Sequence, residues 1–117
     1  MDQGFPKAVR LLKRGEFRTV YDSGTPYRNA GFHLFVLERD TCGPTRIGLT
    51  ASRRTGGAVA RNRMRRRARE AFRRWKSEMP PGRDIVVNFH ASLAGAPREG
   101  FDRLFKDVLE KAHLLQS

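Results

Sequence analysis

The stretch RNRMRRRAREAFRR (residues 61–74) decides how this chain of 117 residues is expected to fold. Eight of its fourteen residues are arginine, and Glu70 is its only acidic residue. The apolar residues of the stretch, together with the tryptophan directly after it, recur at i, i+4, i+7, i+8 and i+11: Met64, Ala68, Ala71, Phe72 and Trp75. The spacing predicts an amphipathic helix that packs one stripe into a core and presents guanidinium groups on its other side.

The positive charge of the chain is concentrated around this helix. The formal net charge is +12, from 24 basic and 12 acidic residues. Between Arg53 and Lys76 there are eleven basic residues and one acid, which gives +10 of that total. A solvated helix usually mixes charge signs at i,i+4, and this segment does not. The charge therefore indicates a polyanionic partner, with nucleic acid the leading class and an anionic membrane surface the second.

Three further features bound the environment of the protein. The sequence contains no apolar run of membrane-spanning length, no lipidation motif and no signal-peptide core within residues 1–13. We therefore expect a cytoplasmic protein. Cys42 is the only cysteine, which excludes an internal disulfide and a cysteine-based zinc site, and it falls in an expected turn at residues 40–44.

A short helix is expected near the N-terminus of what we take to be a single domain. Residues 1–8 are expected to form a loosely held arm. Residues 16–22 then have the pattern of a helix, with Phe17, Val20 and Tyr21 on one face and Ser-Gly as a stop signal.

Two strands are expected before the arginine-rich helix. Residues 24–26 are expected to begin a connection, because Gly and Pro favour turns. Residues 32–39 have the composition of a strand with apolar side chains on both faces. Residues 45–52 alternate apolar and small or polar residues, as a second strand does. We expect these two strands to form an antiparallel pair.

The second half of the chain is predicted to hold two helices and one strand. The arginine-rich helix is expected to begin after Gly57 and to end at about residue 78, before Pro-Pro-Gly. Residues 84–90 form a strand that is covered on both faces, because three consecutive residues are apolar. Residues 92–98 are expected to be a loop, and residues 101–112 an amphipathic helix that packs on the core.

The sequence shows no legible protein active site. His33, His90 and His113 fall on a strand, a strand end and the last helix, and each is interpreted as a structural or surface histidine. Asp and Glu form no close cluster, and no metal-ligand spacing occurs.

Several motifs together resemble those of a known family. Residues 61–63 are an R-N-R triplet, followed by basic pairs and by R-E-x-F-R at residues 69–73. The strand motif RIGLT (residues 46–50) precedes this block, and DIVV (residues 84–87) follows it. The combination resembles the signature of the bacterial ribonuclease P protein family, and the match extends from residue 10 to about residue 113.

The resemblance implies a fold and a function. The fold would be an α+β sandwich of order αβββαβα, with a mostly antiparallel sheet and a left-handed βαβ crossover, an architecture shared with a domain of a ribosomal protein. It would contain one strand more than the pattern predicts. The protein would be the non-catalytic subunit of a ribozyme that removes the 5′ leader of precursor tRNA. Mg²⁺ is expected with the RNA subunit and no cofactor with the protein alone, and no protein partner is implied.

The resemblance also assigns roles to residues by position. One group would bind the catalytic RNA: Arg61, Asn62, Arg63, Arg65, Arg66, Arg69 and Arg73. A second group would line a cleft for the single-stranded leader: Phe17, Tyr21 and Phe35, with charge from Arg10, Arg53 and Arg54.

Two other functions stay open at this point. A ribosomal or general structural RNA-binding protein would share the charge and the α/β pattern without a role in cleavage. A stand-alone, metal-independent nuclease would require catalytic histidines.

Overall fold

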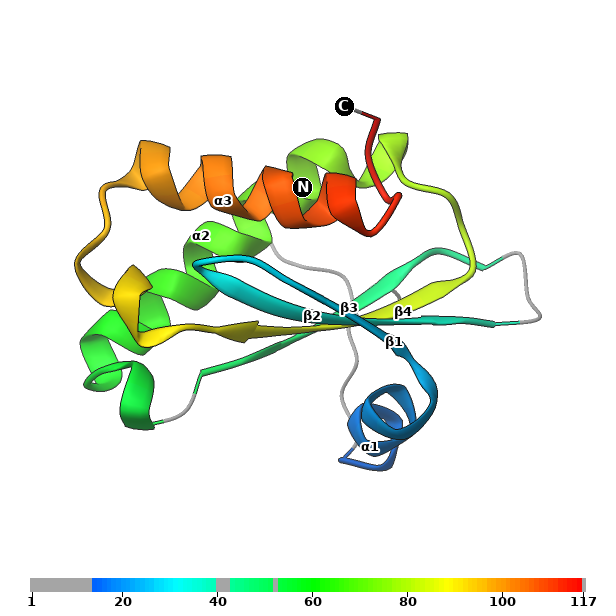
Figure 1. Cartoon of the computed structure of the whole chain (residues 1–117), viewed down its shortest axis with the longest axis horizontal. Helices are drawn as coiled ribbons and strands as arrows, with labels where there is room; N and C mark the ends of the chain where they lie inside the picture. Colours follow the sequence, from blue (N-terminus) through cyan, green and yellow to red (C-terminus); the bar gives the residue numbers. More distant parts are fainter. Residues whose placement is uncertain (1–13, 40–42, 52, 117) are drawn as a thin grey trace, which may run out of the picture.

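The computed structural model describes residues 14–39, 43–51 and 53–116. Three helices and four strands follow one another in the order αβββαβα (Figure 1): α1 (Arg14–Ser23), β1 (Thr25–Arg28), β2 (Phe32–Glu38), β3 (Arg46–Thr50), α2 (Ala58–Trp75), β4 (Arg83–Phe89) and α3 (Arg98–Lys111). Short 3-10 helices add η2 (Arg53–Thr55), η3 (Lys76–Glu78) and η4 (Ala91–Gly95). This is the α+β order that the family resemblance implies. The expected arm at residues 1–8 and Cys42 lie outside the described residues. None of the helices described is both long and apolar enough to cross a membrane.

The four strands form one sheet in the order β1-β2-β4-β3. The pairs β1–β2 and β2–β4 are antiparallel, and β3 runs parallel to β4. Helix α2 therefore connects two parallel neighbours, as a βαβ crossover does. The expected pairing of residues 32–39 with residues 45–52 is wrong, because β4 lies between β2 and β3.

The composition of β4 explains why it takes the central position. Ile85, Val86 and Val87 are consecutive and all 0% exposed, so the strand needs cover on both of its faces. Strands on both sides also pair its backbone groups. A central place in the sheet meets both needs, whereas an edge position would meet neither.

The fourth strand, β1, occupies residues that were expected to begin a connection. It is only four residues long, and three of them are exposed. Pro26 has no N–H to donate, which is tolerated because β1 is an edge strand that pairs only with β2.

Helices cover the two faces of the sheet unequally (Figure 1). Helices α2 and α3 lie on one face, where the main core contains alternate residues of β2, among them Phe32 and Leu34. Helix α1 lies alone on the other face, over a small cluster in which Phe35 and Leu37 pack beside Val20 and Val86. Strand β2 thus has two apolar faces, as its sequence predicts.

The buried stripe of α2 is confirmed. Met64, Ala68, Ala71 and Phe72 are buried, and Trp75 packs against the same core while partly exposed. The α-helix ends at Trp75, and η3 continues the chain as a tighter turn to residue 78, close to the predicted end.

Candidate nucleic-acid interface

The arginines of α2 fall into three groups according to what they face. The first group faces α3 and has partners there. Arg67 donates to the backbone carbonyl of Ala96, in the segment between η4 and α3 (3.0 Å), and Arg74 pairs with Asp102 of α3 (3.1 Å). Glu70, the only acid of the helix, pairs with Arg98 (2.6 Å). The two ion pairs tie α2 to α3 and offset charge there, while Arg67 keeps its charge because its acceptor is a neutral carbonyl.

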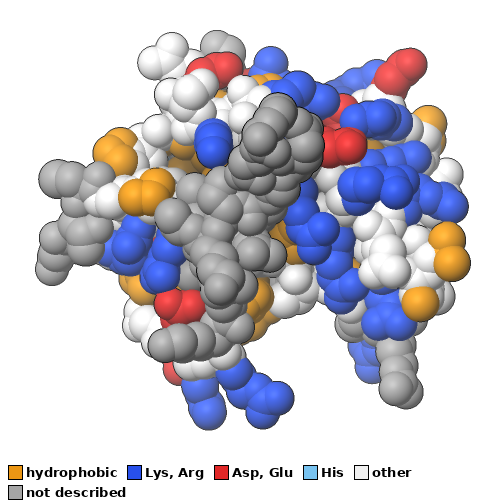
Figure 2. Space-filling model, turned by 180° about the vertical axis from the view of Figure 1, so that it is seen from behind, with side chains coloured by type: hydrophobic (Ala, Val, Ile, Leu, Met, Phe, Trp, Pro, Cys, Tyr) orange, Lys and Arg blue, Asp and Glu red, His pale blue; other side chains and the backbone are white. Residues whose placement is uncertain are grey.

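The second group faces outward, away from the core. Its members are exposed, and none of them makes an ion pair with an acid among the described residues: Arg63, Arg66, Arg69 and Arg73. Asn62 is exposed on the same side. Figure 2 shows Lys and Arg side chains gathered over the half of the surface where α2 lies. Arg66, Arg69 and Arg73 share the helix face opposite Met64 and Arg63 lies on its flank; together these four guanidinium groups form a surface suited to phosphate.

The third group, Arg61 and Arg65, lies between the outward face and the sheet. Both are partly buried. The Nε atom of Arg61 is buried and has no hydrogen-bond partner within the described part of the chain. Arg65 donates to the side-chain oxygen of Asn62 (3.3 Å) and also lines a hollow on the α1 side of the sheet. The family resemblance assigns both residues to the surface that binds the RNA subunit. Arg65 also lines the hollow beside α1, where the leader cleft is predicted.

A groove remains on the α1 face, because α1 covers only part of it. One hollow of about 360 Å³ is lined by Tyr21, Leu49, Thr50, Ala51, Arg65, Asn88 and Phe89. A second hollow of about 210 Å³ shares Asn88 and Phe89 with the first and extends to Arg28, Asn29, Phe32, His33 and His90. The two hollows adjoin at Asn88 and Phe89, and we refer to them together as the groove; Arg65 lines the first hollow and Arg28 the second.

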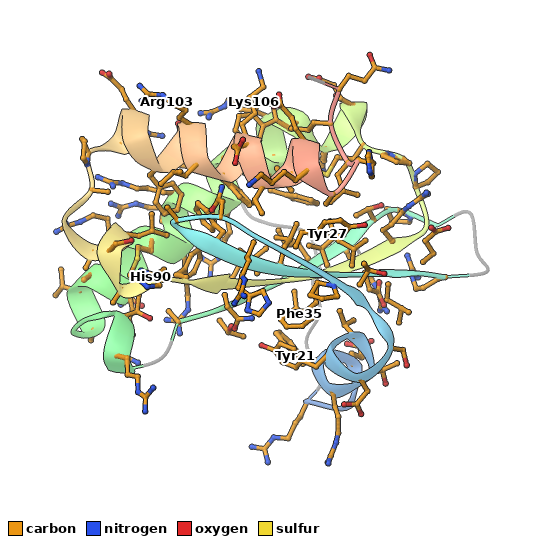
Figure 3. All side chains as sticks on the ribbon, in the orientation of Figure 1. Tyr21, Tyr27, Phe35, His90, Arg103 and Lys106 are labelled. Carbon is orange, nitrogen blue, oxygen red and sulfur yellow. The ribbon has the colours of Figure 1, made fainter. Side chains whose placement is uncertain are left out.

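Aromatic and polar side chains meet in this groove. The ring of Tyr21 is 37% exposed and stands edge-on to Phe35, with 4.9 Å between centroids (Figure 3). Phe35 in turn lies 4.5 Å from the ring of His33. The hydroxyl of Tyr21 donates to Oδ1 of Asn88 (2.9 Å), which also accepts from Thr50. The predicted pair Tyr21 and Phe35 is therefore brought together, with polar groups beside it.

The structure describes the side chains of two of the other residues predicted for the leader cleft, Phe17 and Arg54. Phe17 is partly buried and packs in the apolar cluster beneath α1, so it anchors the helix, and it does not line either hollow of the groove. Arg54 is exposed in η2. Arg53 belongs to η2 by its backbone, and Arg10 lies outside the described residues.

Sequence reasoning missed the polar part of the groove. Asn88 interrupts an otherwise apolar run in β4, and that interruption is a signal that could have identified it. Arg28, His33 and Thr50 carried no comparable signal, because their place depends on the pairing of β1, β2, β4 and β3.

An ion-pair network lies at the other end of α1. Asp84 of β4 is buried and accepts two hydrogen bonds from Arg46 (2.9 and 2.8 Å). Arg39 forms an ion pair with the same carboxylate, with 3.0 Å between its Nε atom and Oδ1 of Asp84. The geometry of this contact is not that of a hydrogen bond. Arg46 also pairs with Glu16 of α1 (2.9 Å). The hydrogen bonds to Asp84, with a smaller contribution from Glu16, raise the pKa of Arg46 above its usual value against the opposing effect of burial.

Metal ligands are not clustered in the part of the chain that is described. No three His, Cys, Asp or Glu side chains there are placed to hold a metal ion.

The fold and the arginine-rich face define a nucleic-acid-binding protein of the α+β class. The family model of ribonuclease P matches residues 5–113. A ribonuclease P protein component from Symbiobacterium thermophilum is 36% identical over 110 residues, which cover 94% of this chain and 96% of that protein. The chain belongs to the ribonuclease P protein family.

Solved structures agree with this assignment. The RNase P protein of Staphylococcus aureus superposes with a TM-score of 0.88 at 26% identity, covering 94% of this chain and all of that one (100%). The RNase P protein of Thermotoga maritima superposes with a TM-score of 0.79 at 27% identity, covering 87% and 96%. The function is that of the protein subunit of ribonuclease P, a tRNA-processing endoribonuclease in which it works with an RNA subunit. The family assignment therefore favours the ribonuclease P subunit over the alternative hypothesis of a ribosomal or general RNA-binding protein.

The environment of His33 predicts a pH dependence of stability. Burial, and secondarily the positive charge of Arg28, lower the pKa of His33 below its usual value of 6.5. The unfolded chain therefore binds a proton at this position more readily than the folded chain does. Stability contributed by the neutral imidazole is present above about pH 6.5 and is lost as the pH falls through the lowered pKa of the folded state.

Urea unfolding at pH 7.5 and at successively lower pH measures this effect. The free energy of unfolding of the wild type should fall more on acidification than that of His33→Gln. The same pH dependence in both proteins would contradict the assignment of this effect to His33.

Proposed function

We propose that the protein binds two parts of the ribonuclease P–substrate complex with two separate surfaces. The outward face of α2 binds the catalytic RNA subunit, and the groove beside α1 binds the single-stranded 5′ leader of precursor tRNA. The observation that carries the proposal is the separation of an unneutralised arginine face from an aromatic groove.

The arrangement of charge supports the first assignment. On the side that faces α3, Arg74 pairs with Asp102 and Glu70 offsets Arg98, whereas the outward arginines have no acidic partner among the described residues. A structured RNA offers phosphates at fixed positions, and guanidinium groups bind them in bidentate geometry. Release of counterions from those phosphates makes such binding strongly dependent on salt.

The shape and chemistry of the groove support the second assignment. Single-stranded RNA leaves its bases free to stack on aromatic rings, which contributes about 1–3 kcal/mol per base in known systems. Tyr21 offers an exposed ring for this purpose. Arg28 and Arg65 are placed to neutralise leader phosphates, and Asn88 offers an amide to base edges.

The catalytic step is assigned to the RNA. We propose that the RNA subunit with its Mg²⁺ ions carries out phosphodiester hydrolysis. The protein would supply binding energy for the leader and would screen the repulsion between two polyanions. The cytoplasmic location expected from the sequence stays a prediction.

The arginine face predicts a selective effect of Arg66→Ala. Loss of one charge-assisted contact should weaken binding of the RNA subunit by about tenfold, on the order of 1.5 kcal/mol. The slope of log affinity against log salt should also decrease by about 0.7–0.9. The measurement is a binding titration with a bacterial ribonuclease P RNA at several salt concentrations.

Arg103→Ala is the matched control for that experiment. Arg103 is exposed on the outer side of α3 (Figure 3), so the variant removes the same charge from a surface that we do not assign to RNA. It should bind almost as the wild type does. Equal losses in the two variants would show that only net charge matters and would contradict a defined face.

The groove predicts that Tyr21→Ala weakens binding of the substrate but not assembly. The reconstituted holoenzyme should lose about fivefold to tenfold in affinity for precursor tRNA, as expected for one lost stacking contact. Its affinity for mature tRNA, which has no leader, should not change. Tyr21→Phe retains the ring and should retain most of the affinity. If precursor and mature tRNA lose affinity equally, Tyr21 does not contact the leader.

A further inference from the structure

Helix α1 is held on its face of the sheet by few apolar contacts. Val20 is its only fully buried residue, and it packs on Val86 of β4. Phe17 and two side chains of β2 add partly buried contacts. An isolated helix of ten residues is marginal in water, so the placement of α1 depends on its contacts with the sheet.

Polar contacts hold both ends of the helix. In the first turn Glu16 pairs with Arg46 (2.9 Å), and near the last turn Tyr21 bonds to Asn88 (2.9 Å). Glu16 pairs with a guanidinium group, that of Arg46, which is itself held in place by Asp84. Arg46 forms a two-bonded fork with Asp84, which is buried in the central strand. The side chains of Arg46 and Glu16 are only 25% and 27% exposed, so solvent screens their pair less than it screens a surface pair.

A glutamate at position 16 of α1 is not expected if charge alone determined how well the groove binds an anionic leader. Its carboxylate lies on the helix that borders the groove, where a negative charge that Arg46 did not offset would repel a polyanion. A carboxylate at such a position is explained when its contribution to geometry exceeds its electrostatic cost.

We propose that Glu16 and Arg46 are positioning residues for leader binding. Their pair extends the rigid fork on Asp84 to α1 and so fixes the distance between this helix and the sheet, which sets the width of the groove. The inference rests on the proposed leader site. Neither residue needs to contact the leader: they act through the position of Tyr21, which α1 carries.

The proposal separates two effects of opposite sign at Glu16. Replacing Glu16 by Gln removes a negative charge, and charge alone would therefore tighten leader binding. Loss of the ion pair releases the first turn of α1, and this loosening would weaken leader binding. The sign of the measured change tells which effect is larger.

Asp22→Asn is the matched control. Asp22 lies on the same helix and also removes one negative charge when replaced. Its partner is Arg18 on the preceding turn (4.0 Å), and the side chains of Asp22 and Arg18 are largely exposed, at 71% and 82%. Their pair thus joins two residues of α1 and does not tie the helix to a strand.

The test uses holoenzyme reconstituted with a bacterial ribonuclease P RNA, with precursor and mature tRNA as ligands. Glu16→Gln should bind precursor tRNA about fivefold more weakly than the wild type, the loss expected for one partly buried charge-assisted bond. Asp22→Asn should bind it as well as the wild type or slightly better. Binding of mature tRNA and of the RNA subunit should be unchanged in both variants, a split that general destabilisation would not produce.

Arg46→Lys provides a second variant if Glu16→Gln folds poorly. Lysine retains the charge but lacks the fork needed to hold Asp84 and Glu16 together, so it should also weaken precursor binding selectively. Precursor binding as tight in Glu16→Gln and Arg46→Lys as in Asp22→Asn would overturn the proposal. If the two variants bind normally while Tyr21→Ala binds precursor weakly, the positioning role fails and the leader site stands. If Tyr21→Ala has no effect either, the leader site itself is contradicted.

Discussion

Strand β4 carries apolar side chains on both of its faces, and the arrangement of the other elements follows from the need to cover both. Ile85 and Val87 face the core under α2 and α3, while Val86 faces α1. Burial of each such side chain is worth roughly 1.5–3 kcal/mol, so leaving either face open would be costly for a domain of this size. A three-layer sandwich with β4 at the centre of its sheet is the result.

This three-layer arrangement gives the protein two different surfaces. Where two helices cover the sheet, the apolar stripe of α2 is buried, and its outward arginines have no acidic partner among the described residues. Where α1 alone covers the sheet, part of the face stays open, and side chains of all four strands and two helices contribute to its lining. We propose that the protein uses the first surface to bind the RNA subunit and the second to bind the leader.

Features that depend on local spacing were predictable from the sequence. The stripe of Met64 and Phe72 marks the buried side of α2, and three consecutive apolar residues mark β4 as covered on both faces. The parallel pairing of β3 and β4 could not be predicted from local spacing, because the two strands are separated by the whole of α2; only the family resemblance implied it, through its βαβ crossover. Strand β1 was missed because Thr25 and Pro26 have the composition of a turn and its pairing is set by β2. Of the residues predicted for the leader cleft, only Tyr21 lines the groove, with Phe35 packed against its ring, since the polar residues of the groove are brought together by strand order.

Separate surfaces for the two RNAs are the central claim, and site-specific photo-crosslinking tests it most directly. A photoreactive amino acid would replace Arg66 in one protein and Tyr21 in another, each assembled with a bacterial ribonuclease P RNA and precursor tRNA. We predict that position 66 crosslinks to the RNA subunit and position 21 to the 5′ leader. Crosslinking of both positions to the same RNA segment, or of position 21 to the RNA subunit alone, would contradict the claim.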